Sequence, residues 1–131
     1  MFNQLADFYH STAAIQWPGG RQATGIAAIS GLIIDWLASC PDAKMVIDHL
    51  CVTSYDERRV HIAIRWGVAG TYNGQSVAVS EFTGQAYYVL GASHFELENG
   101  LIRREWTVFD EVAALANLMR KLPNNGEELA C

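Results

Sequence analysis

The stretch that decides the fold is VHIAIRWGVAG, residues 60–70. Large apolar residues at positions 60, 62, 64, 66 and 68 alternate with smaller or polar ones, the period of two expected of a strand with one buried face. The same enrichment in β-branched and aromatic residues recurs in three further stretches, residues 45–53, 76–97 and 101–109. Asn73-Gly74 and Asn99-Gly100 are typical of two-residue hairpin turns, because both central positions of a type I′ turn need positive φ. This part of the chain therefore predicts a meander of long antiparallel strands.

Helical patterns flank the meander. The spacing of Phe2, Leu5, Ala6 and Tyr9 predicts a short helix up to about Tyr9, and residues 14–17 a brief strand that ends at Pro18-Gly19-Gly20. A second helix follows, with Thr24 as its N-cap and Pro41 just past its end. Residues 111–122 predict a last helix, stopped by Pro123. The order indicates an α+β domain over residues 1–123, with a strongly curved antiparallel sheet packed by helices into a cone around an apolar pocket, and a flexible tail over 124–131.

Composition narrows the function classes. The chain has 131 residues, half of them apolar and 18% charged, enough for one domain with a real core. Its net charge is -5 and its Lys and Arg are scattered, which disfavours nucleic-acid binding. The most apolar run, residues 25–40, is too short to span a membrane and contains Asp35.

Cysteine usage and the absence of signature motifs add two expectations. The three cysteines, Cys40, Cys51 and Cys131, are an odd number without CxxC or metal-ligand spacing, and no signal-peptide pattern begins the chain. We therefore expect free thiols and a cytoplasmic location. The sequence has no nucleotide-binding glycine loop, no GxSxG elbow and no metal-ligand cluster, so we expect neither an organic cofactor nor a metal.

Several motifs, in order along the chain, resemble the SnoaL-like (polyketide cyclase-like) branch of the nuclear transport factor 2-like superfamily. They are Phe8-Tyr9-His10, residues 15–18 and 21–25, Arg65-Trp66 with residues 70–74, Thr83-Gly84, residues 99–102, Glu105-Trp106 and Asp110. The resemblance implies a curved sheet around an apolar pocket. Two departures stand out: Tyr72 occupies the position of the family's hairpin His, and the family's long first helix has no counterpart here. We therefore expect either a more open pocket or a cover from another subunit.

The resemblance makes Asp110 the first catalytic candidate. In family members that close rings, the Asp at this motif position is the general acid/base. A carboxyl in an apolar cavity suits that chemistry, because desolvation moves its pKa upward. The alternative is structural: Asp110 directly precedes the last helix and could cap it. The two roles are not exclusive.

Two residues near the Asn99-Gly100 turn depend on the strand register. Trp106 lies four residues before Asp110, so both point to one side of an unbroken strand, where Trp106 is either a pocket wall or core. His94 is the nearest match to a His that family catalysts carry on the penultimate strand. A strict two-residue turn, however, pairs His94 with Glu105 on the opposite, outer face. Only a β-bulge or a longer loop would turn His94 inward.

The remaining candidates line the predicted pocket or its rim. Trp66 lies on the apolar face of its strand. His49 faces it in one register and Asp48 in the other, and either would need a polar partner. The other candidates for substrate contact, each also compatible with ordinary packing, are Tyr9, Trp17, Trp36, Tyr72 and Tyr88.

Three functions compete on this sequence. The first is a small cofactor-independent acid/base enzyme, cyclase- or isomerase-like, acting on a hydrophobic carbonyl or polyketide-like compound. The second is a domain that binds a hydrophobic small molecule without catalysis, and the third is a dimerisation domain; the fold alone does not choose. We also predict a homodimer through the outer sheet face, where His61, Arg65, Glu96, Arg103 and Glu105 are expected to form ion pairs.

Overall fold

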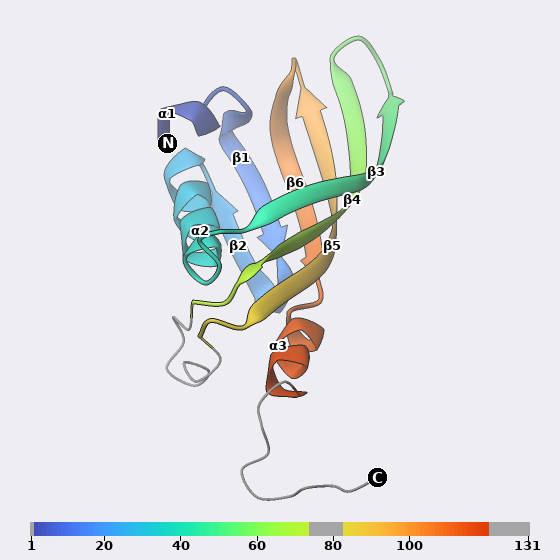
Figure 1. Ribbon diagram of the computed structural model, residues 1–131. Coiled ribbons are helices and arrows are strands. Elements are labelled where there is room, and N and C mark those ends of the chain that lie inside the picture. Colours follow the sequence, from blue (N-terminus) through green and yellow to red (C-terminus); the bar gives the residue numbers. More distant parts are fainter. Residues whose placement is uncertain (1, 74–82, 121–131) are drawn as a thin grey trace, which may run out of the picture.

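The computed structural model describes residues 2–73 and 83–120 (Figure 1). Its elements, in chain order, are α1 (Phe2–Leu5), β1 (Tyr9–Trp17), the 3₁₀ turn η1 (Pro18–Gly20), β2 (Arg21–Thr24), α2 (Ile26–Ala38), β3 (Lys44–Ser54), β4 (Arg59–Thr71), β5 (Ala86–Glu98), β6 (Leu101–Phe109) and α3 (Glu111–Arg120). The predicted turn at Asn73-Gly74 and the predicted tail over 124–131 fall wholly or partly outside the described residues.

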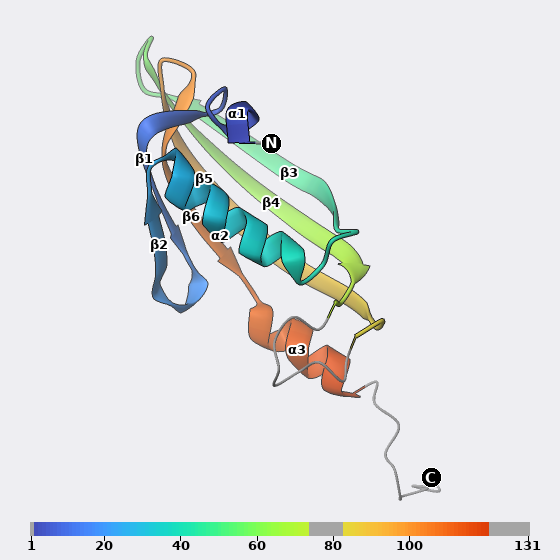
Figure 2. The same cartoon turned by 90° about the vertical axis from the view of Figure 1, so that its left-hand side faces the viewer.

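The six strands among the described residues form one sheet in the order β2-β1-β6-β5-β4-β3. β3 to β6 make the predicted antiparallel meander, and β1 joins it by pairing parallel with β6. α2 lies along one face of this sheet, here called the inner face, while α3 continues from the lower end of β6 (Figure 2). The α+β class with a curved sheet is confirmed, and the single parallel pair makes the sheet mixed.

Local sequence explains the turns that shape the sheet. Asn99 and Gly100 have φ of 52° and 82°, as the type I′ hairpin requires, and β6 has the predicted bounds. Gly25 has φ of 84° and donates its N–H to the Ala13 carbonyl, so the N-cap of α2 is Gly25 and not Thr24. This positive φ favours glycine, since an L side chain is strained there.

The N-terminal predictions were partly wrong. α1 ends at Leu5, and Tyr9 begins a nine-residue strand instead of ending a helix. The predicted brief strand over 14–17 is the end of this longer β1, which hydrogen-bonds to β2 on one side and β6 on the other. Long-range pairing with β6 therefore overrides the local helical spacing around Tyr9.

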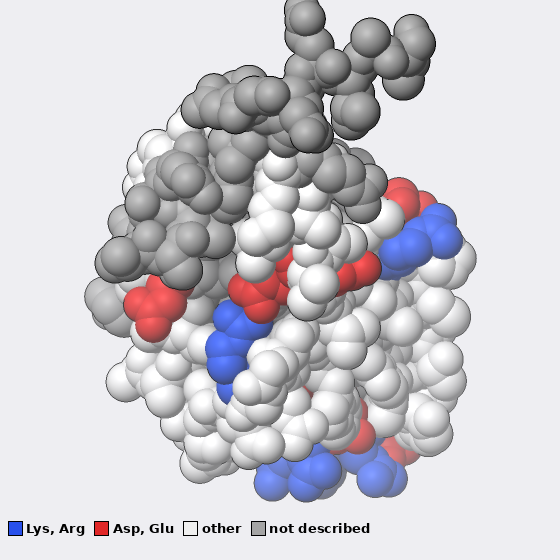
Figure 3. Space-filling model, turned by 90° about the horizontal axis from the view of Figure 1, so that it is seen from below, with Lys and Arg blue, Asp and Glu red and all other residues white. Residues whose placement is uncertain are grey.

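The core lies between the inner face and the helices. One cluster joins Trp66, Val68, Val89, Phe109 and Leu118, and a second, under α2, joins Ala13, Ile15, Ala23 and Ile29. No helix within the described residues is long and apolar enough to cross a membrane. Seen from below, basic and acidic side chains are scattered over a largely uncharged face (Figure 3).

Candidate functional site

A cavity of about 280 Å³ lies between α2 and the inner face of the sheet. Its walls are mostly aromatic and aliphatic, and its polar side chains are Tyr9, Ser93, Glu105 and Thr107. The apolar lining residues are Trp17, Ile33, Trp36, Leu37, Met45, Ile64, Trp66, Phe95 and Phe109. Met45, on edge strand β3, is 51% exposed, so the wall on that side borders solvent. An apolar cavity with a few convergent polar groups is the usual form of a small-molecule site.

Glu105 is the polar centre of this cavity. The residue is only 5% exposed. Its Oε2 accepts a 2.5 Å hydrogen bond from the Tyr9 hydroxyl, and its Oε1 accepts bonds of 3.0 Å from Trp17 Nε1 and 2.7 Å from Thr107 Oγ1. A carboxylate buried without partners is costly, and these three donors offset that cost. The carboxylate is therefore held in one place, facing an apolar space.

Tyr9 stays a hydrogen-bond donor in this arrangement. Burial of its ring and, next in size, the nearby Glu105 carboxylate raise the pKa of the Tyr9 phenol far above its usual range, because both disfavour a second negative charge. The phenol thus remains protonated at any working pH. Tyr9 and Glu105 are the titratable residues among those described as lining the cavity.

A β-bulge brings Glu105 inside. Leu97 pairs with Ile102, but Glu96 pairs with Arg104, so Arg103 is an extra residue on β6. From Arg104 onward, each side chain of β6 therefore points to the opposite face from the one that a regular two-residue hairpin would give it. The predicted pairing of His94 with Glu105 on the outer face was therefore wrong. His94 pairs with Trp106, and Glu105 pairs with Phe95 on the inner face.

His94 and Trp106 lie on the outer face and do not line the cavity. Their rings are 5.6 Å apart, and His94 Nε2 lies 3.1 Å from His61 Nδ1. His61 in turn contacts Tyr55, with the ring centroids 4.4 Å apart. His94 thus lies on the outer face, as the regular register predicted. The β-bulge, which was the condition for an inward His94, instead exchanges Trp106 for Glu105 on the inner face.

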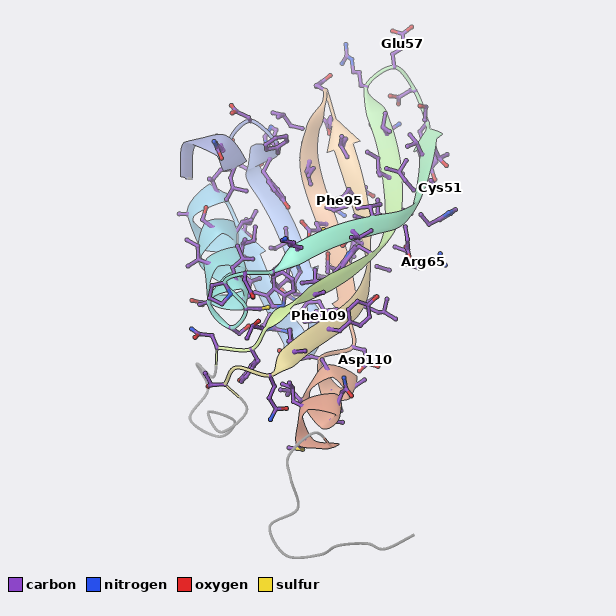
Figure 4. The ribbon with its side chains drawn as sticks, viewed as in Figure 1. Cys51, Glu57, Arg65, Phe95, Phe109 and Asp110 are labelled. Carbon is purple, nitrogen blue, oxygen red and sulfur yellow. The ribbon has the colours of Figure 1, made fainter. Side chains whose placement is uncertain are left out.

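Asp110 caps the last helix, which is the structural alternative that the sequence offered to a catalytic role. Its Oδ1 accepts a 2.8 Å bond from the Ala113 N–H, which caps the first turn of α3, and the side chain is exposed. In Figure 4, Asp110 lies below Phe109, where β6 meets α3. It lines an open hollow on the outer face together with Arg65 and Val108, and not the cavity around Glu105.

Removing this cap should cost stability and leave the cavity intact. We expect Asp110→Ala to lower the free energy of unfolding by about 1 kcal/mol, the usual cost of losing an N-cap side chain. Urea denaturation measures this, with Asp110→Ser, which keeps a capping oxygen, as the matched control. An unchanged stability in Asp110→Ala would contradict the capping role.

A second β-bulge, in β3, explains why His49 lies beside Arg65 on the outer face and not opposite Trp66. Ile47 pairs with Trp66 and His49 with Arg65, leaving Asp48 as the extra residue of β3. Ile47 thus shares the inner face with Trp66, and both registers that we weighed for this strand were wrong. Asp48 forms a 3.0 Å ion pair with Arg65 on the exposed outer side.

The other candidates divide into two groups. Tyr9, Trp17, Trp36 and Trp66 line the cavity around Glu105. Tyr72 is buried in the core near Tyr87, and Tyr88 is exposed, with its ring over Gly67 on the outer face. The structure therefore brings four of the predicted aromatic residues together around the cavity. The candidates that do not line it are His49, Tyr72, Tyr88, His94, Trp106 and Asp110.

Sequence reasoning missed Glu105, Ser93 and Thr107. Glu105, Thr107 and Phe109 alternate along β6 and so share a face, but the bulge at Arg103 hides which face that is. Phe109 is the large apolar residue on that face, but Trp106 and Val108 on the opposite face are also apolar, so the residues of β6 alone give no signal that distinguishes the two faces. Within the described residues, no group of three or more His, Cys, Asp or Glu side chains could hold a metal ion.

Comparisons with solved structures agree on one fold. The chain superposes on a candidate SnoaL-like polyketide cyclase from Jannaschia sp. CCS1 with a TM-score of 0.72 and 13% identity, covering 93% of this chain and 80% of the other. For a candidate polyketide cyclase from Acidithiobacillus ferrooxidans the TM-score is 0.75, the identity 16% and the coverage 92% and 84%.

A third similar structure is IdmH, a candidate polyketide cyclase from Streptomyces antibioticus. Its TM-score is 0.72, its identity 21% and its coverage 89% of this chain and 86% of that one. No curated protein sequence matches the chain significantly. The sequence profile of SnoaL-like polyketide cyclases matches residues 1–118, nearly the whole chain. The protein therefore belongs to the SnoaL-like polyketide cyclase family.

Proposed function

We propose that this protein is a small cofactor-independent acid/base enzyme that acts on an uncharged, largely apolar carbonyl compound, with Glu105 as the proton-transferring group. The observation that carries the proposal is the burial of one carboxylate at the centre of an aromatic cavity. The cyclase family to which the chain belongs supports this reaction class. Glu105 replaces Asp110 and His94 as the acid/base candidate, because of these three residues Glu105 alone lines the cavity.

The two carboxylate oxygens are not equivalent. Oε1 accepts bonds from Trp17 and Thr107, which fills its two lone pairs, whereas Oε2 accepts only the bond from Tyr9 among the described residues. The free lone pair of Oε2 takes the proton from a carbon next to the ligand's carbonyl group. The electron pair of that C–H bond forms the enolate, and Oε2 then returns the proton to carbon or oxygen.

The lining also sets the charge of the ligand. No Lys, Arg or His is among the described residues that line the cavity, and Glu105 supplies negative charge. An anionic ligand would meet Glu105 in a weakly screened, apolar space with no counter-ion. The flat rings of Trp17, Trp36, Trp66 and Phe109 suit a planar, uncharged compound.

A simple reaction tests the proposal without the natural substrate. 2-Tetralone is a compact, uncharged bicyclic ketone with an acidic C–H next to its carbonyl. Because the cavity borders solvent at Met45, the proton held on Oε2 exchanges with D₂O before a deuteron is returned to carbon. The protein should therefore accelerate deuterium uptake at that carbon, followed by proton NMR. Binding of the ketone without faster exchange would instead identify a non-catalytic binding protein, the alternative that the sequence left open.

We also propose that two copies associate through the outer sheet face. Val46 on β3, Tyr88 and Leu90 on β5 and Val108 on β6 project from this face and are exposed. Exposed apolar patches on a protein surface often mark an interface. Arg65 and Asp110 line the same hollow as Leu90 and Val108. In a two-fold interface, Arg65 of one copy can therefore approach the Asp110 carboxylate of the other.

A charge placed in this surface should separate the two copies. We expect Val108→Glu to convert a dimer into a monomer, because the buried charge would lack a partner. Val112→Glu on α3 is the matched control, since Val112 is 78% exposed and Val108 65%. Light scattering at micromolar concentration measures the mass, and a monomeric wild type would refute the interface.

A cytoplasmic location remains part of the proposal. Cys40 is buried and Cys51 exposed, and both are free thiols. Free exposed thiols persist in a reducing compartment.

A further inference from the structure

Four side chains on three neighbouring strands are joined in a row beneath the cavity. Trp66 Nε1 on β4 lies 3.0 Å from Ser93 Oγ on β5, and Ser93 Oγ lies 2.7 Å from Thr107 Oγ1 on β6. Thr107 Oγ1 is 2.7 Å from Glu105 Oε1. Ser93 is 7% exposed and Thr107 5%, so both hydroxyl side chains are buried.

The chemistry of the two ends fixes the direction of every proton in this row. An indole N–H can only donate, so Trp66 donates to Ser93. A carboxylate can only accept, so Thr107 gives its single hydroxyl proton to Glu105. The proton between the two hydroxyls then belongs to Ser93, which donates to Thr107. All three bonds point toward Oε1, and bonds aligned in this way polarise one another.

We propose that Trp66, Ser93 and Thr107 form a one-way hydrogen-bond chain that positions Glu105 by occupying Oε1, leaving Oε2 to meet the ligand. Trp66 and Ser93 are then positioning residues, since they act on the ligand only through Thr107 and Glu105. The statement about Oε2 rests on the proposed function; the chain itself does not, because it exists without a ligand.

Gly91 holds the far end of the chain in place. A Cβ at this position would lie 2.2–2.6 Å from three atoms of the Trp66 indole. The ring therefore lies flat across Gly91, the residue paired with Trp66 on β5, and this orientation aims Nε1 at Ser93, two residues further along. The missing side chain at Gly91 is what allows the bond from Trp66.

The indole N–H signals of the four tryptophans test the chain directly by ¹⁵N-edited NMR. Trp17 bonds to Glu105, and Trp66 reaches it only through two hydroxyls. Trp106 lies on the outer face, and Trp36 Nε1 has no partner among the described residues. In Glu105→Gln, which removes the charge and keeps the shape, we expect the signals of Trp17 and Trp66 to move and that of Trp106 to stay.

Breaking the middle of the chain should uncouple its two ends. In Ser93→Ala, the change Glu105→Gln should lose most of its effect on the Trp66 signal and keep its effect on Trp17. Ser93→Thr restores a hydroxyl and should restore the coupling. Thr107→Val breaks the next link and provides a second test if Ser93→Ala folds poorly.

Two results would overturn the proposed hydrogen-bond chain. One is a Trp66 signal that does not move in Glu105→Gln; the other is a Trp66 signal that moves equally with and without the Ser93 hydroxyl. The measurement needs no substrate, so it separates failure of the chain from failure of the proposed reaction. If the chain stands and 2-tetralone exchange is absent, the chain positions a binding group and the acid/base assignment fails alone.

Discussion

Glu105→Gln should slow deuterium uptake by 2-tetralone by about 10²–10⁴-fold, the usual contribution of a single acid/base group. An amide keeps the size of the side chain and accepts bonds through its oxygen, but it cannot take a proton from carbon. Since the cavity keeps its shape, binding of the ketone should change little. The loss should therefore fall on the exchange rate at saturating ketone, measured by NMR.

Asp110→Asn is the matched control for this variant. It also neutralises one carboxylate, but at the cap of α3 and outside the cavity. We expect Asp110→Asn to exchange the ketone at close to the wild-type rate. An unchanged rate in Glu105→Gln, or a comparable loss in Asp110→Asn, would remove Glu105 from the proton-transfer role.

Gly91→Ala should destabilise the fold by about 2–4 kcal/mol, combining an overpacked core with a lost buried hydrogen bond. The new methyl group would meet the Trp66 indole, which is 3% exposed, and a shift of the ring into the cavity that it lines would break its bond to Ser93. Urea denaturation measures the change. Gly91→Ala combined with Trp66→Leu, which removes the obstructing ring, should cost less than the sum of the two single variants.

Gly31→Ala makes the same glycine-to-alanine change at another position and should have the opposite effect on the free energy of unfolding. Gly31 lies within α2, and a Cβ there meets nothing within 4 Å. Alanine should stabilise this helix by about 0.5–1 kcal/mol, because it restricts the unfolded chain and favours the helix. Equal effects of the two substitutions would show that Trp66 does not lie against Gly91 in solution.

The sequence was sufficient to predict the order of most elements. Alternation in residues 60–70 predicted β4, and Asn99-Gly100 predicted the tight hairpin that the structure has. These features were predictable because each depends on local spacing and local φ preferences. β2 and the first half of β1 were missed, since their strand conformation depends on long-range pairing.

The site was less predictable because it depends on two single-residue bulges. The extra Asp48 and the extra Arg103 each reverse which side chains face inward. Alternation alone placed Trp106 inside and Glu105 outside, and the motif resemblance drew attention to Asp110. Four aromatic residues of the cavity were still identified, because they lie on β1, α2 and β4 and not on β3 or β6, the strands that carry the two extra residues.

The central claim is that the aromatic cavity around Glu105 binds an uncharged planar compound. 2-Acetylnaphthalene and 2-naphthoate have nearly the same shape and differ in charge, so calorimetric titration of both into the wild type and Glu105→Gln tests the claim most directly. The wild type should bind the ketone and reject the carboxylate, and Glu105→Gln should narrow that difference at least tenfold. Equal binding of both compounds to the wild type, or a preference that Glu105→Gln leaves unchanged, would contradict the claim.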